Sequence, residues 1–186
     1  MTLLTSANLP IGKFTAFDFH LLGIDDKIYS LASFSEKKGL VLVFTCNHCP
    51  YALASWPLLI SLAEKYQLKK IGFAAINAND DKLYPEDSFT EMKLKVHEWG
   101  LNFPYLHDKF QITARNYQAQ CTPDIYVFDQ DRRLYYHGRI NDNWQDSSKV
   151  TSQDLQTALD LLLSDKNPPQ NQYPSMGCSI KWKEST

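Results

Sequence analysis

The sequence predicts an α/β fold in which a mixed central sheet is flanked by helices. Two unbroken apolar runs, at residues 39–45 and 70–77, have the length of strands that are covered on both faces. Between them, from about residue 50 to residue 66, apolar side chains recur at helical spacing, so the three segments form a β-α-β unit. The stretch 121–140 contains two strand-like runs around a polar turn, which indicates an antiparallel hairpin.

The composition favours one globular domain. The 186 residues are 44% hydrophobic and 13% aromatic, enough for one sizeable core. We expect a single domain over residues 1–186, with its core at about 12–164 and a tail at 165–186. The net charge of −2 and the absence of a basic stripe argue against nucleic acid or a membrane as partner. We find no targeting segment and expect a cytoplasmic protein.

Before the first central strand, the sequence predicts a small amino-terminal β-hairpin. Apolar runs at 14–19 and 27–31 flank a Gly-Ile-Asp-Asp turn. In the helix that follows the first central strand, Pro57 removes one backbone donor and clashes with the preceding turn. We therefore expect a kink at that proline.

The best-supported helix spans residues 88–99. Ser88 and Glu91 have the spacing of a capping box, and Gly100 follows the last turn. A short strand at about 105–107 comes next.

Three further segments complete the chain. A helix is expected at about 109–117, with Asp108 as its N-cap, and another at about 152–163. After residue 165 a Pro- and Asn-rich connection leads to an alternating segment at 178–183. This pattern predicts a strand that packs back on the domain with one face buried, namely the face of Cys178, Ile180 and Trp182.

Two cysteines separated by two residues stand where the first central strand gives way to its helix, in the stretch VLVFTCNHCPYA. A helix amino terminus favours a thiolate, so we expect the pKa of Cys46 to lie below the ordinary value of about 8.5. The spacing lets Cys49 come within bonding distance of Cys46. Cys46 is thus the predicted nucleophile and Cys49 the predicted resolving thiol.

The residues around the pair are expected to support this chemistry. A protonated His48 would stabilise the thiolate and the reduced form. Asn47 completes the spacer, and Pro50 follows the second cysteine directly.

The remaining cysteines leave several alternatives open. Cys121 and Cys178 are either small buried side chains or additional redox thiols. Together with the CxxC pair they offer the thiols of a zinc site, and a copper-binding module would use the pair with a histidine. The other histidines are assigned no chemistry, namely His20, His97, His107 and His137.

A strand that ends in CxxC at a helix start, a β-α-β unit, and a Thr-Pro that opens a hairpin before a last helix resemble the thioredoxin superfamily over about residues 12–164. The segments CNHCPYA, NANDD, YPEDSF, CTPD and GCSIKWK resemble the peroxiredoxin-like AhpC/TSA proteins of bacteria. The resemblance implies a thioredoxin-like fold. It also implies that the Thr122–Pro123 bond is cis, faces the cysteines and leaves the Thr122 backbone available to a partner.

The sequence departs from these relatives in three ways. Thr45 and Asn47-His48 replace the Trp and the Gly-Pro around thioredoxin's cysteines. The PxxxTxxC spacing of peroxiredoxins is missing, since Val43 stands three residues before Cys46. Leu40 replaces the buried aspartate that thioredoxin carries six residues before its first cysteine, which leaves Asp80 and Asp124 as candidate proton acceptors.

We therefore predict a thiol-disulfide oxidoreductase with a cis-proline docking loop and no bound cofactor or metal. The alternatives are a thiol peroxidase that reduces hydroperoxides and a metal-binding module of the copper-chaperone kind. The expected partners are protein thiols or disulfides, or small hydroperoxides, with an external reductant.

Overall fold

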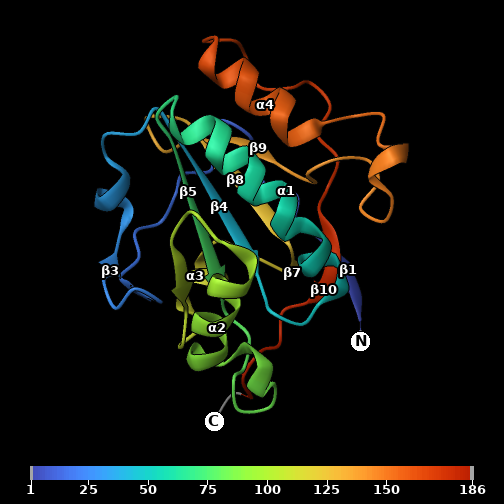
Figure 1. Cartoon of the computed structure of the whole chain (residues 1–186). Helices are drawn as coiled ribbons and strands as arrows, with labels where there is room; N and C mark the ends of the chain where they lie inside the picture. The colour runs from blue at the N-terminus through green and yellow to red at the C-terminus, as the bar shows by residue number, and fades with distance from the viewer. Residues whose placement is uncertain (1, 185–186) are drawn as a thin grey trace.

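The structure is a computed structural model, and it describes residues 2–184. Its centre is a seven-stranded mixed sheet with the strand order β3-β2-β6-β5-β4-β8-β9 (Figure 1). The strands of this sheet are β2 (Leu21–Gly23), β3 (Ile28–Tyr29), β4 (Gly39–Thr45), β5 (Ile71–Asn77), β6 (Tyr105–His107), β8 (Asp124–Phe128) and β9 (Leu134–His137). β4, β5 and β6 are parallel neighbours, whereas the other pairings in the sheet are antiparallel.

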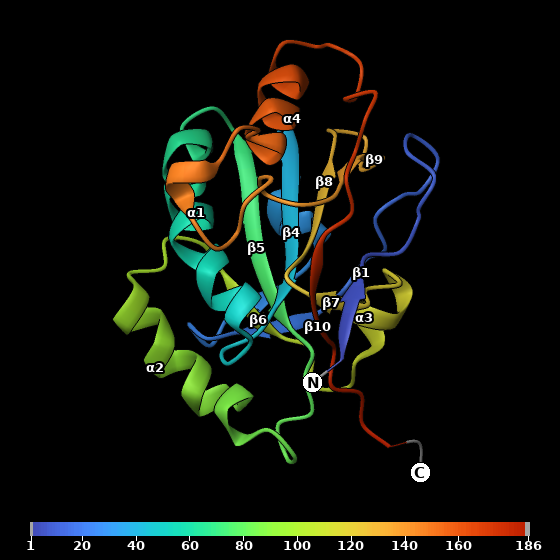
Figure 2. The same ribbon diagram turned by 90° about the vertical axis from the view of Figure 1, so that its right-hand side faces the viewer.

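Helices cover both faces of this sheet. They are α1 (Pro50–Gln67), α2 (Phe89–Trp99), α3 (Ile112–Asn116) and α4 (Asp154–Leu163), with the 3-10 helices η1 (Leu31–Phe34), η2 (Pro85–Asp87) and η3 (Ser147–Lys149). In Figure 2, α1 and α2 lie on one side of the sheet and α3 on the other. Val41 and Val43 of β4 pack in the core shared with α1, α2 and α4, whereas Leu42 and Phe44 pack in the second core. This division follows from the alternation of side chains along a strand.

A second, three-stranded sheet joins the two ends of the chain to the middle. Its order is β1-β10-β7, and both pairings are antiparallel. The strands are β1 (Leu3–Thr5), β10 (Met176–Ser179) and β7 (Cys121–Thr122), which lie side by side in both views (Figures 1 and 2). The prediction that the carboxy-terminal tail packs back is confirmed.

The main predicted elements are also confirmed. β4, β5 and α1 have nearly the predicted bounds, and α1 continues through Pro57. The side chain of Ser88 accepts a hydrogen bond from the backbone N–H of Glu91 and caps α2, and Gly100 ends that helix with a φ of 65°.

The structure moves several of the predicted boundaries. The amino-terminal hairpin forms between β2 and β3, and the run 14–19 contributes only a bridge from Thr15 to Arg133. The helix predicted at 109–117 begins at Ile112, because the residues before it form a turn closed by a 2.9 Å hydrogen bond from Gln111 to the carbonyl of Asp108. Asp108 still caps this segment, since its Oδ2 accepts the N–H of Ala114 at 2.8 Å.

The tail strand is shifted toward the amino terminus relative to the prediction. β10 ends at Ser179 because the chain then bonds to the loop after β5, where the Asp80 N–H donates to the Lys181 carbonyl at 2.8 Å. Cys178 and Ile180 are buried as expected, but Trp182 is 36% exposed. No helix within residues 2–184 is both long enough and apolar enough to cross a membrane.

Candidate active site

Cys46 and Cys49 lie at the junction between β4 and α1. Cys46 is the first residue after β4, Cys49 is the N-cap residue of α1, and Pro50 opens the helix. Both cysteines are 0% exposed, and neither is in a disulfide in this structure. Their side chains form one buried cluster with those of Ala52 and Cys178. The structure thus brings the two thiols together, as the CxxC spacing predicts.

Thr122 faces both thiols. The Thr122–Pro123 bond is cis, as the resemblance implies. The Oγ1 of Thr122 lies 3.4 Å from the Sγ of Cys46, and the Thr122 carbonyl accepts a 3.3 Å hydrogen bond from the Cys49 thiol. The backbone edge that we expected to be open to a partner is occupied, because β10 pairs with β7 and places Cys178 opposite Thr122.

The two residues between the cysteines contact a buried carboxylate, that of Asp87. The backbone N–H of Asn47 donates to Oδ1 of Asp87 at 2.7 Å, and Nδ1 of His48 lies 2.8 Å from Oδ2. The His48 ring stacks on Tyr84 with its centroid 5.5 Å away. The contact with Asp87 raises the pKa of His48, although burial opposes the shift. A positive charge is thereby held next to the cysteines over a wider range of pH.

Polar side chains from the sheet and from the loop after β5 hold Asp87 in place. The Nδ2 atoms of Asn77 and Asn79 donate to it at 3.2 and 2.7 Å. The hydroxyl of Tyr105 accepts a hydrogen bond from Asn77 and donates one to the side chain of Asn47. Burial alone would raise the pKa of Asp87, but these contacts and the histidine lower it overall. Asp87 is therefore a charged group in the interior that is fully paired.

The pKa values of the two thiols shift in opposite directions. The hydrogen bond with Cys46 lowers the pKa of Cys49 to about 4, against the effect of burial. Cys178 and the backbone of Ala52 add to this lowering. For Cys46, the same hydrogen bond, burial and the negative charge of Asp87 raise the pKa. The hydrogen bond with Cys49, burial and Asp87 thus oppose the low pKa that the sequence predicts for Cys46, and Cys49 rather than Cys46 is the N-cap residue of α1.

The two remaining cysteines have different surroundings. Burial and the neighbouring Asp124 raise the pKa of Cys121, whose Sγ lies 3.6 Å from the Pro123 carbonyl. Cys178 belongs to the cluster of the pair, and burial together with Cys49 raises its pKa to about 12. The structure therefore brings Cys178, rather than Cys121, to the site.

Sequence reasoning missed Asp87 and proposed two other carboxylates. Asp80 accepts the N–H of Lys82 at 3.1 Å, and Asp124 lies 2.8 Å from the ring of His137. Asp87 stands forty positions from Asn47 in the sequence, just before a helix start, where an acidic residue is ordinarily solvated. Asn47 in the CxxC spacer could have indicated that a buried polar group lies nearby, because an asparagine at a buried junction requires a polar partner.

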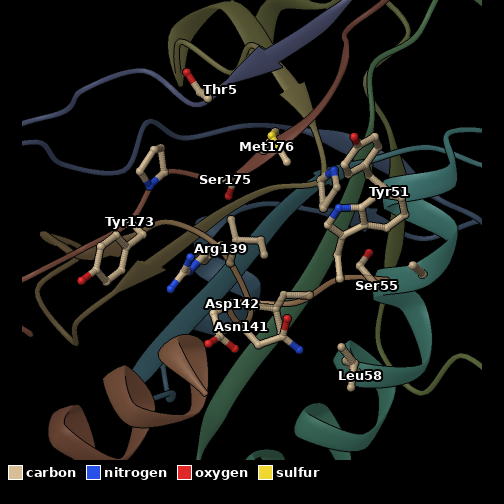
Figure 3. A pocket seen from close by; sticks show the side chains of 16 residues that line it. Thr5, Tyr51, Ser55, Leu58, Arg139, Asn141, Asp142, Tyr173, Ser175 and Met176 are labelled. Carbon is tan, nitrogen blue, oxygen red and sulfur yellow. The ribbon is translucent and has the colours of Figure 1, made fainter. Parts of the chain in front are cut away.

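A cavity of about 300 Å³ lies beside the amino-terminal half of α1. Tyr51, Ser55 and Leu58 of α1 line one side, and Tyr173 and Met176 of the tail line the other (Figure 3). Its further lining includes Pro123, Arg139 and Trp144, and the rings of Trp144 and Tyr51 are 4.0 Å apart. The cavity thus reaches from the cis-proline loop along the helix that carries Cys49.

One group of side chains has the composition of a metal site. The donor atoms of Cys46, His48 and Asp87 lie within 4.8 Å of one another. The set combines a soft sulfur, an imidazole and a carboxylate, which suits zinc. It differs from the predicted set in that Asp87 stands in place of Cys49.

The fold and the site define a thioredoxin-like protein with a CxxC pair opposite a cis-proline. The chain belongs to the AhpC/TSA family, whose pattern it matches over residues 13–137. The predicted thioredoxin-like fold and the predicted family are both confirmed.

Solved structures share this fold. An uncharacterized conserved protein from Geobacillus kaustophilus is 40% identical, with a TM-score of 0.95, over 100% of this chain and 99% of that chain. A hypothetical protein from Sinorhizobium meliloti 1021 is 35% identical, with a TM-score of 0.93, over 97% and 99%. A putative thiol:disulfide interchange protein DsbE from Chlorobium tepidum shares the fold at 18% identity and a TM-score of 0.68, over 84% and 99%. A search of curated proteins gave no match.

Proposed function

We propose that this protein is a thiol-disulfide oxidoreductase in which Cys46 and Cys49 alternate between dithiol and disulfide. The observation that carries the proposal is the contact of both sulfurs with Thr122, at 3.4 Å and 3.3 Å, next to a cis-proline. The low pKa of Cys49 supports it further, because thiolates and not thiols attack disulfides.

In the proposed reaction, the Cys49 thiolate attacks one sulfur of a partner disulfide. The partner's S–S bond breaks, and one partner sulfur leaves as a thiol after taking up a proton. Cys46 then loses its proton and attacks the Cys49 sulfur of the mixed disulfide, which releases the second partner thiol. Two electrons pass to the partner, and an external dithiol must return them. This order exchanges the roles that the sequence suggested for the two cysteines.

The charged groups of the site favour attack by Cys49 first and by Cys46 second. Asp87 disfavours a negative charge on Cys46 in the resting pair, so Cys49 is the sulfur that begins the reaction. The cavity beside Tyr51 and Pro123 can receive an apolar side chain of the partner next to its disulfide.

Reduction of insulin disulfides with a supplied dithiol tests the proposal. We expect turnover with the native protein and none with Cys49→Ser. Cys121→Ser is the matched control and should retain full turnover, since Cys121 is buried outside the cluster. Equal turnover of native protein and Cys49→Ser would refute the proposal.

The family favours hydroperoxide reduction as a second candidate. There the Cys49 thiolate would attack the peroxide, release an alcohol or water and become a sulfenic acid. Condensation with Cys46 would then form the disulfide and release water. Consumption of hydrogen peroxide and a mass increase of one oxygen in Cys46→Ser would favour this candidate.

The grouping of Cys46, His48 and Asp87 supports a metal-binding role as a third candidate. It predicts that one equivalent of zinc protects Cys46 from alkylation in native protein but not in His48→Gln. Unchanged alkylation with zinc would exclude it.

A further inference from the structure

The carboxy-terminal strand places a third sulfur beside the pair. β10 runs antiparallel to β7, with Cys178 opposite Thr122 and Ser179 opposite Cys121. The hydroxyl of Thr122 donates to the carbonyl of Cys178 at 3.5 Å. The side chain of Cys178 thereby enters the cluster of Cys46 and Cys49.

The fit between β10 and the cis-proline loop is close. A Cβ atom added at Gly177 would lie 2.0 Å from the carbonyl oxygen of Thr122, so only glycine allows this approach. The neighbouring residue Cys178 is consequently held against the loop that contacts both reactive thiols. This position differs from that of Cys121, whose sulfur faces backbone carbonyls.

β10 also covers the edge at which a partner strand would dock. The thioredoxin-like loop offers the backbone of β7 for strand pairing, and here the chain's own tail takes that place. Both thiols of the pair are 0% exposed beneath this cover. The strand that occupies the partner's position, β10, carries Cys178. The tail therefore lies where the cysteine-containing segment of a bound substrate would lie.

We infer that Cys178 is a third redox thiol, which exchanges with the oxidised pair to form a disulfide between Cys49 and Cys178. This inference rests on the proposed redox function of the pair. The Cys178 sulfur attacks the Cys49 sulfur, the bond between Cys46 and Cys49 breaks, and Cys46 takes up the proton that Cys178 gives up. The electrons stay within the chain, so the step needs no oxidant beyond the partner that first oxidised the pair.

Oxidation of the pair favours this attack. In the reduced state, Cys49 is among the groups that raise the pKa of Cys178. Once Cys49 is in a disulfide, that negative charge is gone and the Cys178 thiolate forms more readily. Exchange then depends on the contact that the strand register already provides.

Peptide mapping tests the inference, because trypsin places the cysteines on three separate peptides. Cys46 and Cys49 fall on residues 39–65, Cys121 on 116–132 and Cys178 on 167–181. The full chain is oxidised with one equivalent of diamide, and remaining thiols are alkylated before digestion without reductant. In native protein, where the exchange occurs, we expect the 39–65/167–181 cross-link in a measurable share of chains. In Cys46→Ser, where diamide can only join Cys49 and Cys178 directly, we expect it in most chains. In Cys49→Ser we expect roughly tenfold less, because the low-pKa thiol is missing.

Gly177→Ala tests the positioning without removing a sulfur. The added methyl group displaces β10, so cross-linking in Cys46→Ser should fall about fivefold, as expected when reacting atoms lose their alignment. Gly100→Ala is the control for the general cost of replacing a glycine: its φ of 65° strains an alanine, but nothing lies within 4 Å of the added Cβ and the residue ends α2, outside β10. Circular dichroism verifies the fold of each variant, and Cys46→Ala replaces a serine variant that does not fold.

The outcomes separate this inference from the proposed function. If insulin is reduced and the Cys46–Cys49 disulfide forms, but Cys178 stays fully alkylated in Cys46→Ser, the inference is refuted and the function stands. If the 39–65/167–181 cross-link forms and insulin is not reduced, the inference holds and protein disulfides are not the substrate. Equal cross-linking in Cys46→Ser and Cys49→Ser would also refute it.

Discussion

The chain contains two aspartate–histidine pairs, namely Asp87 with His48 and Asp124 with His137. In each pair a carboxylate oxygen lies 2.8 Å from a ring nitrogen, and both aspartate side chains are fully buried. The histidines differ, since the His48 side chain is 14% exposed and that of His137 is 3% exposed. The first pair is therefore more accessible to solvent than the second.

The sulfurs next to the two pairs differ as well. Asp87 acts on Cys46, one of two neighbouring thiols, and its negative charge adds to the hydrogen bond with Cys49 and to burial in raising the pKa of Cys46. Asp124 acts on Cys121, where burial is the larger cause of the raised pKa and no second thiol shares the proton. At the first site a buried aspartate raises the pKa of one of two neighbouring thiols, Cys46. At the second site a buried aspartate raises the pKa of a thiol, Cys121, that shares its proton with no second thiol.

The largest effect is expected from Asp124→Asn. Asp124 binds the ring of His137 and the hydroxyl of Tyr126, so the change should lower the free energy of unfolding by about 3 kcal/mol. Urea denaturation measures this loss. The ratio of alkylation between Cys49 and Cys46 should not change, and a changed ratio would mean that the two pairs are not independent.

A surface control accompanies this prediction. Asp131→Asn removes the carboxylate of an exposed pair, whose nearest approach to Arg133 is 3.9 Å. Its cost should stay below about 0.5 kcal/mol. A cost similar to that of Asp124→Asn would show that burial does not set the difference.

The features that the sequence predicts correctly are those that depend on interactions between residues close together in the chain. The β-α-β unit and the helix at 88–99 are predictable because apolar periodicity and capping residues are local signals. The cis bond at Pro123 followed from the resemblance alone. The ionisation of the pair could not be predicted, since it depends on the contact between Cys46 and Cys49, on burial and on Asp87, which no local pattern places at the site.

The position of the carboxy-terminal tail was also only partly predictable from the sequence. Alternation predicted that Cys178 is buried, and the structure agrees. Its contact with Cys49 depends on the register of β10 against β7, which two-residue periodicity does not define.

We expect Asp87→Asn to have an intermediate effect on the free energy of unfolding. An asparagine cannot accept all the hydrogen bonds from Asn47, Asn77 and Asn79, and its own amide group lacks an acceptor there. We expect a loss of about 2 kcal/mol in the free energy of unfolding. Unlike Asp124→Asn, this change should also raise the alkylation of Cys46 relative to Cys49, because the repulsion at Cys46 disappears.

Iodoacetamide labelling between pH 5 and pH 8, followed by fragmentation of peptide 39–65, measures that ratio. The reagent must reach a buried pair, so the ratio of the two cysteines is more informative than the absolute rate. A ratio that stays at the native value would contradict the role of Asp87 in placing the thiolate on Cys49.

The smallest effect concerns the pH dependence of His48. Its pKa in the folded protein is raised above the ordinary 6.5, so protonation stabilises the native state. This contribution is fully present below pH 6.5 and is lost as the pH rises through the raised pKa. For His48→Gln we expect a deficit of about 1 kcal/mol at low pH.

Urea denaturation of native protein and His48→Gln from pH 5 to pH 9 measures the deficit, which should shrink toward the alkaline end. His97→Gln is the matched control, because His97 is exposed on α2. If the His48→Gln deficit instead grows with pH, then His48 acts as a neutral hydrogen-bonding group.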